Sequence, residues 1–348
     1  MNIIFDNIIF SLQKHGGVSV LWGELINRIL ISGIESIFMD YKNAFKNQVR
    51  KSIEIPHNKL IVGNSPIILE RYINPKVPMS SPFLFHSSHY RISMEPYASN
   101  ITTVHDFTYE YYFKGLPKMI HCWQKYRAIR NSKLIICISE NTKRDLLHFL
   151  PEMKNSDIRV VYNGVSDDYY PLSNIDGVSY EGFLLFVGGR QSYKNFRFAV
   201  ECARYIRKRL LIIGGPLSDV EISYLTKELG KDCFKSIVHP SNKELNKIYN
   251  SVDCLIYPSL YEGFGIPVIE AQKAACPVIA MNSSSIPEII GNKSTLLNSS
   301  NTSKFKEVYR NIQSNRTEIV IEGIENSKRF SWDRMTNEYL NIYNELLQ

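Results

Sequence analysis

Short apolar runs alternate with amphipathic helical segments twice along this chain of 348 residues, and this alternation limits the possible folds most strongly. The first round contains ITTVHD, KLIICIS and RVVYNG. The second round starts near residue 183 and contains FLLFVGG, RLLIIGG, SIVHP, CLIYPS and CPVIAM. Alternating strands and helices are typical of parallel-sheet α/β domains. The two rounds therefore predict two Rossmann-like parallel-sheet domains of the α/β class.

The length and the turn residues suggest where these domains divide. A chain of 348 residues is too long for one ordinary hydrophobic core. The polar segment YYPLSNIDGVSYEG is the best linker. We therefore predict an N-terminal domain over residues 1–172, a C-terminal domain over 173–330 and a final helix over 331–348.

The composition places the chain among globular proteins of a reducing compartment. Hydrophobic residues make up 44% of the chain and charged residues 22%, and no apolar run approaches the roughly 18–20 residues that span a membrane. The start MNIIFDNIIF reaches Asp6 without a basic region, so it predicts a strand rather than a signal peptide. The six scattered cysteines fit reduced thiols, and not a disulfide framework or a zinc site.

The net charge of +7 favours an anionic partner. Eight lysines and arginines and a single acid, Glu140, lie between Lys114 and Arg144, among several aromatic residues. This stretch is either a solvated helix face or a surface for acidic lipid headgroups. The second interpretation assigns the lipid contact to Lys118, Lys125, Arg127 and Arg130. A nucleic-acid partner is not expected, because no recognition module is present.

Two glycine turns are candidates for phosphate binding. In GGRQSYKNF the cations Arg190 and Lys194 follow a glycine pair at a predicted helix start, and a helix N-terminus with two cations suits a diphosphate. The simpler interpretation is a tight turn with two surface cations. The pair Gly16-Gly17 forms an analogous turn in the N-terminal half.

The stretch YEGFGIPVIEA places two carboxylates, Glu262 and Glu270, on either side of a glycine-rich turn. Pro267 predicts a helix start, so Glu262 lies in the loop and Glu270 near the first helical turn. Each carboxylate can accept hydrogen bonds from a vicinal diol. The turn residues that would lie under the ligand are Gly263, Phe264, Gly265 and Ile266.

Two other chemistries fit this pair less well. A glycosidase would need the carboxylates as acid and base across one scissile bond. A metal-bridged diphosphate would need carboxylate ligands, and the chain contains no Asp-x-Asp sequence. In TVHDF, His105 follows a predicted strand and is either a buried structural histidine or part of the site. A zinc site combining it with His86 and His89 matches no standard ligand spacing.

Taken together, several motifs resemble those of family-4 glycosyltransferases of the GT-B fold. They are the early GG, TVHD, CISENTKRDL, YNGVSDDYYP, FVGGRQSYKN and YPSLYEGFGIPVIEA, in the order and spacing of that family over nearly the whole chain. The resemblance implies two Rossmann-like domains that face each other across a cleft, and a final helix that crosses back to the N-terminal domain. It also implies retaining transfer of a sugar from a nucleoside-diphosphate sugar, with no metal and no cofactor.

The same resemblance implies a role for each candidate residue. Glu270 would bind the nucleotide ribose and Glu262 the hydroxyls of the donor sugar. Arg190 and Lys194 would neutralise the diphosphate. Gly17 would donate its N–H to that diphosphate, and His105 would lie beside the reacting centre.

The resemblance extends to bacterial O-antigen and capsule mannosyltransferases. It implies GDP-mannose as the donor, a polyprenyl-diphosphate-linked glycan as the acceptor, and a cytoplasmic protein bound peripherally to the inner face of the membrane. The alternative is a nucleotide-sugar-binding pseudoenzyme or partner subunit with the same fold.

Overall fold

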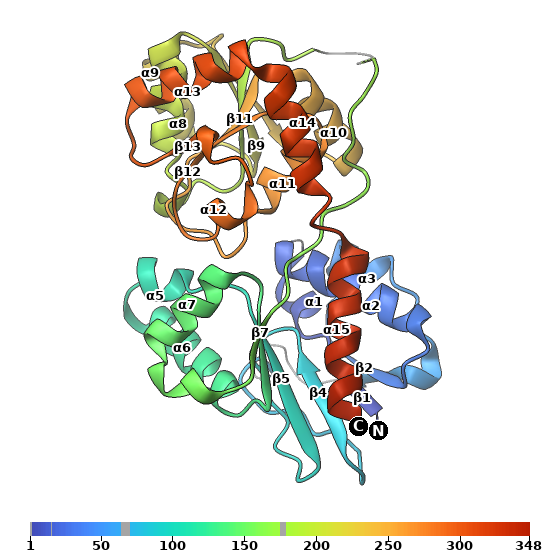
Figure 1. Cartoon of the computed structure of the whole chain (residues 1–348). Helices are drawn as coiled ribbons and strands as arrows, with labels where there is room; N and C mark the ends of the chain where they lie inside the picture. The colour runs from blue at the N-terminus through green and yellow to red at the C-terminus, as the bar shows by residue number, and fades with distance from the viewer. Residues whose placement is uncertain (1, 15, 64–69, 175–178) are drawn as a thin grey trace. The chain divides into compact units, whose positions relative to one another are not determined.

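A computed structural model describes residues 2–14, 16–63, 70–174 and 179–348, and in it the chain divides into two compact units (Figure 1). Unit 1 comprises Met1–Gly164 and Trp332–Gln348, and unit 2 comprises Val165–Ser331. Each unit contains one parallel sheet with helices packed against it. The sequence had placed the division at residue 172, whereas residues 165–172 group with unit 2.

The described part of unit 1 contains a seven-stranded sheet in the order β3-β2-β1-β4-β5-β6-β7, and every neighbouring pair is parallel. The strands are β1 (Asn2–Asp6), β2 (Ser36–Tyr41), β3 (Leu60–Gly63), β4 (Phe83–Ser87), β5 (Ala98–Val104), β6 (Leu134–Cys137) and β7 (Ile158–Val160). The chain adds strands outward in one direction from β1 to β3 and in the other direction from β4 to β7, so the strand order reverses between β1 and β4. In sheets of this type, ligands bind at such a reversal point.

Helices cover this sheet and connect its strands. They are α1 (Ile9–Leu12), α2 (Gly17–Ser32), α3 (Gln48–Lys51), α5 (Thr108–Tyr112), α6 (Gly115–Arg130), α7 (Glu140–Phe149) and α15 (Trp332–Leu347), with 3₁₀ turns at Ala44–Lys46, His57–Lys59 and Pro151–Asn155. The last helix, α15, comes from the far end of the chain and packs against α2 and β4 (Figure 1).

A buried aromatic cluster holds α15 against the sheet. His86 on β4 lies between Trp22 of α2 and Tyr343 of α15, with ring centroids 5.0 and 5.9 Å away. Its Nδ1 is 2.7 Å from the Tyr343 hydroxyl, and its Nε2 is 2.9 Å from the Thr103 hydroxyl. Burial lowers the pKa of His86 to about 3, so the ring stays neutral and needs both hydrogen-bond partners.

The described part of unit 2 contains a six-stranded parallel sheet in the order β10-β9-β8-β11-β12-β13. The strands are β8 (Phe183–Val187), β9 (Arg209–Gly214), β10 (Phe234–Val238), β11 (Cys254–Tyr257), β12 (Val278–Met281) and β13 (Leu296–Leu297). The helices are α8 (Phe196–Ile206), α9 (Asp219–Leu229), α10 (Asn242–Ser251), α11 (Ile266–Lys273), α12 (Ile286–Ile289), α13 (Thr302–Ser314) and α14 (Arg316–Ser327), with 3₁₀ turns at Ser192–Lys194 and Lys293–Thr295.

Three asparagines on one face of α10 bind the segment that precedes the second sheet. Asn242 accepts a hydrogen bond from the Tyr169 hydroxyl, Asn246 from the Tyr170 N–H and Asn250 from the Leu172 N–H, at 3.2, 3.1 and 2.8 Å. Residues four apart lie on the same helix face, so the three amides form a row along the chain segment. This row explains why 165–172 belongs to unit 2. Residues 175–178 of the predicted linker lie outside the described residues.

The predicted α/β class with two parallel sheets is confirmed, and the apolar runs named above form strands. Continuous apolar runs do this because the strands of such sheets are buried on both faces. Among the helices of the described residues, none combines the length and apolar character that crossing a membrane requires.

Replacing Tyr343 with Phe should lower the free energy of unfolding by about 1–3 kcal/mol, because the change leaves the buried Nδ1 of His86 without its partner. Urea unfolding followed by tryptophan fluorescence measures this. Tyr97→Phe is the matched control, because Tyr97 is 50% exposed and should lose almost nothing. Equal midpoints for both variants would contradict the proposed role of the His86 cluster.

Candidate active site

The loop between β11 and α11 carries the predicted Glu-x7-Glu motif. Gly265 has a φ of 106°, and a Cβ there would lie 2.6 Å from Cδ1 of Ile286, so both the backbone and the space require glycine. Pro267 occupies the first turn of α11, as predicted. The motif therefore ends a buried strand, makes a tight left-handed turn and starts a helix.

Three consecutive serines after β12 hold this loop in place. The Ser283 hydroxyl donates to the Ser259 carbonyl at 2.8 Å, and the Ser284 hydroxyl accepts from the Glu262 N–H at 2.8 Å. The Ser285 hydroxyl lies 3.0 Å from the Glu262 carbonyl and 2.8 Å from that of Phe264. Side chains from the segment after the neighbouring strand therefore fix the loop backbone, which has no strand-to-strand hydrogen bonds of its own.

Glu262 and Lys194 form an ion pair at the end of this loop. Lys194 Nζ lies 2.6 Å from Glu262 Oε1, and both side chains are largely buried. Lys194 comes from the 3₁₀ turn after β8, so the structure brings together two residues that are 68 positions apart in the sequence. When a cation and a carboxylate are in contact, the cation can bind a phosphate and the carboxylate can accept a hydrogen bond from a sugar hydroxyl next to that phosphate in the same ligand.

Arg190 is engaged elsewhere. Its Nε lies 2.5 Å from Oε1 of Glu221 on α9, and its terminal nitrogens donate to the carbonyls of Gly215 and Pro216 at 3.2 and 2.7 Å. Hydrogen bonds from Arg190 lower the pKa of Glu221 to about 2. The structure therefore places Lys194 with Glu262, and Arg190 with the loop after β9. A diphosphate would have to compete with Glu221 for Arg190.

Glu270 lies in the second turn of α11, slightly beyond the predicted first turn. The hydroxyl of Tyr249 on α10 donates to its Oε2 at 3.0 Å, and Tyr169 also interacts with this carboxyl. Burial raises the pKa of Glu270 to about 7, although the hydrogen bonds from both tyrosines act in the opposite direction.

The remaining predicted residues belong to unit 1 and are described within it. Gly16 precedes the first turn of α2 and Gly17 begins it, and Gly16 provides no side-chain cap for the helix. A Cβ on Gly17 would meet nothing within 4 Å, so the backbone there is open to an approaching group. Helix N-termini with such free N–H groups bind anions well.

His105 follows β5, at the same edge of the sheet as the start of α2, because both β1 and β5 run parallel to β4. The ring is 8% exposed. Burial lowers the pKa of His105 to about 4, and Lys125 adds to this effect while Asp106 opposes it. His105 is therefore neutral near pH 7 and can act through its ring nitrogens or its carbonyl, but not as a cation.

The position of Lys125 contradicts its predicted contact with lipid headgroups. It is fully buried, and its ammonium group donates to Glu110 Oε2 at 2.9 Å and to the Asp106 carbonyl at 2.8 Å. A buried lysine is retained when it is paired in this way. Lys125 thus supports the segment after His105 and cannot contact a lipid headgroup.

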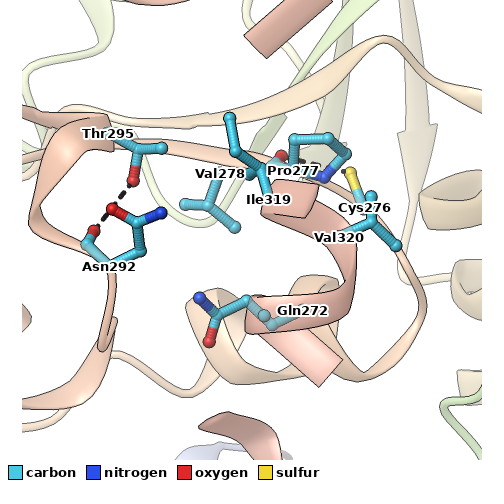
Figure 2. Close-up of a pocket in the computed structure, with 9 residues that line it drawn as sticks. Gln272, Cys276, Pro277, Val278, Asn292, Thr295, Ile319 and Val320 are labelled. Atoms are coloured by element: carbon cyan, nitrogen blue, oxygen red, sulfur yellow. Dashed lines mark hydrogen bonds between the residues drawn. The ribbon is translucent and has the colours of Figure 1, made fainter. Parts of the chain in front are cut away.

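A small cavity lies behind the second sheet, where Figure 2 shows Gln272, Cys276 and Ile319 among its lining residues. Its cavity volume of about 10 Å³ is room for a single water molecule and excludes a sugar or a nucleotide. Nor do the described residues contain a group of three or more histidines, cysteines or carboxylates placed to hold a metal ion.

Sequence reasoning missed the groups that support the motif. These are Ser283, Ser284, Ser285, Tyr249, Tyr169 and the asparagine row of α10. The asparagine spacing of four was visible in the sequence, as was the serine run. The hydrogen-bond partners of these residues could not be predicted, because each partner is distant in the sequence.

Comparison with solved structures supports the GT-B fold. The sucrose-phosphate synthase (tll1590) from Thermosynechococcus elongatus aligns with a TM-score of 0.76 at 16% identity, covering 100% of this chain and 99% of that chain. Anabaena Alr3699/HepE in complex with UDP and glucose aligns with a TM-score of 0.71 at 14% identity, over 99% and 100% of the two chains. At such identities the likeness establishes the fold alone.

Sequence comparison then defines the family. Residues 178–328 match the family described as Glycosyl transferases group 1, and residues 81–169 match Glycosyltransferase Family 4. The O-antigen chain mannosyltransferase B of Escherichia coli is 22% identical over 99% of this chain and 99% of its own. The chain thus contains a Glycosyl transferases group 1 domain and a Glycosyltransferase Family 4 domain, in agreement with the motifs.

The ionisation of Glu270 should make donor binding depend on pH. Because the pKa is about 7 and ribose hydroxyls donate preferentially to the carboxylate, affinity for a nucleoside-diphosphate sugar should rise as pH increases through about 7. Titration calorimetry between about pH 6 and about pH 8 measures this trend. In Glu270→Gln the affinity should be lower and independent of pH, whereas the exposed control Glu318→Gln should behave as the unmodified protein. If the donor affinity of the unmodified protein did not depend on pH, the proposed role of Glu270 would be contradicted.

Proposed function

We propose that this glycosyltransferase transfers mannose from GDP-mannose to a growing polyprenyl-diphosphate-linked oligosaccharide, with retention of the anomeric configuration and without a metal. The donor and acceptor rest on the O-antigen chain mannosyltransferase B of Escherichia coli, which matches over 99% of both chains. The place of action that follows is the cytoplasmic side of a membrane. The choice of mannose and of this acceptor is the part that experiment must decide.

The contact between Lys194 and Glu262 is the observation that carries the chemistry. The nucleoside-diphosphate leaving group develops negative charge, and the sugar develops oxocarbenium character. Lys194 stabilises the first, while Glu262 holds the donor-sugar hydroxyls next to it. Since the pair is already formed and fixed by the serine run, the site needs little reorganisation at the transition state.

Arg190 and Glu270 complete the proposed donor site. Arg190 exchanges Glu221 for the diphosphate, a competition between a carboxylate and a more highly charged anion. Glu270, held by Tyr249, accepts hydrogen bonds from the ribose hydroxyls. Within unit 1, the N-terminus of α2 with Gly16 and Gly17 is the group that we propose for binding a phosphate through backbone N–H groups.

The proposed mechanism uses the donor itself as the base. In same-face transfer, the departing β-phosphate oxygen accepts the proton of the attacking hydroxyl, and the new glycosidic bond forms on the side that the phosphate leaves. His105, buried and neutral, contributes a hydrogen-bonding group beside the sugar. Retention then requires no covalent glycosyl-enzyme intermediate.

Glu262→Gln should leave the dissociation constant for GDP within about twofold and reduce transfer at saturating donor by about 10²-fold or more, because the lost interaction acts on the donor sugar. Glu270→Ala should behave oppositely and weaken donor binding by about 1.5–3 kcal/mol. GDP release from GDP-mannose, followed with and without acceptor, separates the two effects. If Glu262→Gln lost GDP affinity at unchanged turnover, the roles would be assigned wrongly.

A panel of nucleotide sugars distinguishes the enzyme from a nucleotide-sugar-binding pseudoenzyme or partner subunit. Transfer of mannose to a polyprenyl-diphosphate-linked acceptor supports the proposal. Tight donor binding without turnover, for any donor in the panel, would support the alternative. Turnover with a different donor would support the assignment as a glycosyltransferase but would show that the transferred sugar is not mannose.

EDTA should leave the rate of the chemical step unchanged, since Lys194, Arg190 and the helix N-terminus carry the charge that a metal would otherwise balance. Single-turnover rates before and after chelation measure this. Rates restored only by Mn²⁺ or Mg²⁺ would overturn the proposed phosphate site.

A further inference from the structure

The outer face of α6 exposes a row of large apolar side chains. Leu116, Met119 and Trp123 are 66%, 67% and 54% exposed, and Ile120 lies between them on the same face. The spacing i, i+3, i+4 and i+7 aligns the four on one side of a helix. We call these four residues the α6 stripe.

The opposite face of α6 is the one that packs into unit 1. The buried residues are His121, Gln124, Lys125, Ala128 and Ile129. The ion pair of Lys125 with Glu110 fixes this orientation, because rotating the helix would expose or break a fully buried pair. The α6 stripe is therefore exposed by the fold itself, and its apolar residues lie outside the core.

The segment before α6 continues the apolar surface. Phe113 is 38% exposed, and its ring stacks on Tyr109 at a centroid distance of 4.3 Å. Tyr109 in turn stacks on His121 of α6 at 3.8 Å. These contacts hold the end of α5 against the first half of α6. Exposed apolar groups gathered in this way mark a binding surface rather than scattered surface residues.

The charges within the segment that carries the α6 stripe are of one sign. No aspartate or glutamate occurs between residues 111 and 139. Lys114 precedes the stripe, and Arg127 and Arg130 follow it on the same side of the helix. Arg127 lies 5.1 Å from the ring of Trp123, and Arg130 pairs with Glu152 at an exposed site. An apolar stripe with a cationic border complements an anionic interface with an apolar layer beneath it.

We propose that the α6 stripe is the surface by which this protein binds an anionic phospholipid bilayer, with its apolar side chains at the boundary between headgroups and acyl chains. Its link to a lipid-linked acceptor rests on the proposed function. A second copy of the chain fits less well, because a two-fold interface would bring the cationic borders together. The lipid contact moves from Lys125, which is buried, and Lys118, whose ammonium group donates to the Glu110 carbonyl, to the apolar residues, with Lys114, Arg127 and Arg130 at the border.

Trp123 allows the contact to be observed directly. The other two tryptophans, Trp22 and Trp332, are 1% and 5% exposed, so Trp123 dominates the solvent-accessible fluorescence. Adding vesicles of phosphatidylglycerol and phosphatidylcholine should shift its emission to shorter wavelength and protect it from a water-soluble quencher. The variant Trp123→Phe should lose this response but still co-sediment with the vesicles.

Co-sedimentation of the full chain with the same vesicles tests the stripe. The triple variant Leu116→Ser, Met119→Ser, Trp123→Ser should bind at least about tenfold more weakly. The matched control Val220→Ser, Ile321→Ser removes two exposed apolar residues of unit 2, which are 79% and 61% exposed, and should bind normally. Unchanged binding by the triple variant, or equal loss in the control, would overturn the proposal.

Further measurements distinguish lipid binding by the α6 stripe from misfolding of the variant, from dimerisation and from the proposed function. GDP affinity of the triple variant should equal that of the unmodified protein, which shows that the variant is folded and the donor site intact. Light scattering without vesicles should give the same molecular mass for the unmodified protein and the triple variant. If the unmodified protein were a dimer and the triple variant a monomer, the α6 stripe would instead be an interface with a second copy of the chain. Vesicle binding that persists in a protein that transfers no sugar would leave the surface standing and refute the proposed function.

Discussion

All described strands of each sheet run in one direction, and this constraint places the candidate site residues in the loops and helix starts beyond the strands. Parallel strands present their carboxyl ends at one edge, so the residues that follow them gather there. A loop lacks the hydrogen-bond ladder of a strand, and its backbone must be fixed by other groups. The serine run after β12 does this for the Glu262 loop, and the asparagine row of α10 does it for the segment that carries Tyr169.

The charged groups of the site are held in pairs until a ligand arrives. Lys194 pairs with Glu262, and Arg190 pairs with Glu221. Such pairing lets a cationic site remain folded without an anion, because each charge is compensated in the unliganded protein. In the proposed donor site, the donor would gain affinity from groups already near their positions, and the free-energy cost would come from the exchange of Glu221 for phosphate on Arg190.

Burial gives the two halves of α6 different roles. Lys125 faces inward and supports the segment after His105, while the α6 stripe faces outward. A single helix thereby links the interior next to the proposed reacting centre with a surface suited to lipid. The proposed lipid-linked acceptor would require both features, and α6 provides them on its two faces.

The α/β class, the strands, the glycine turn and the spacing of Glu262 and Glu270 are all predictable from the sequence, because periodicity, glycine and proline act locally. It also carried the family motifs, which depend on order along the chain. Only the tertiary structure decided that Arg190 binds Glu221, that Lys125 is buried and that Ser285 holds the loop. Each of these depends on a partner that is distant in sequence. The face of α6 that packs inward was likewise undecided, because apolar residues occur on both sides of that helix and the buried ion pair selects one.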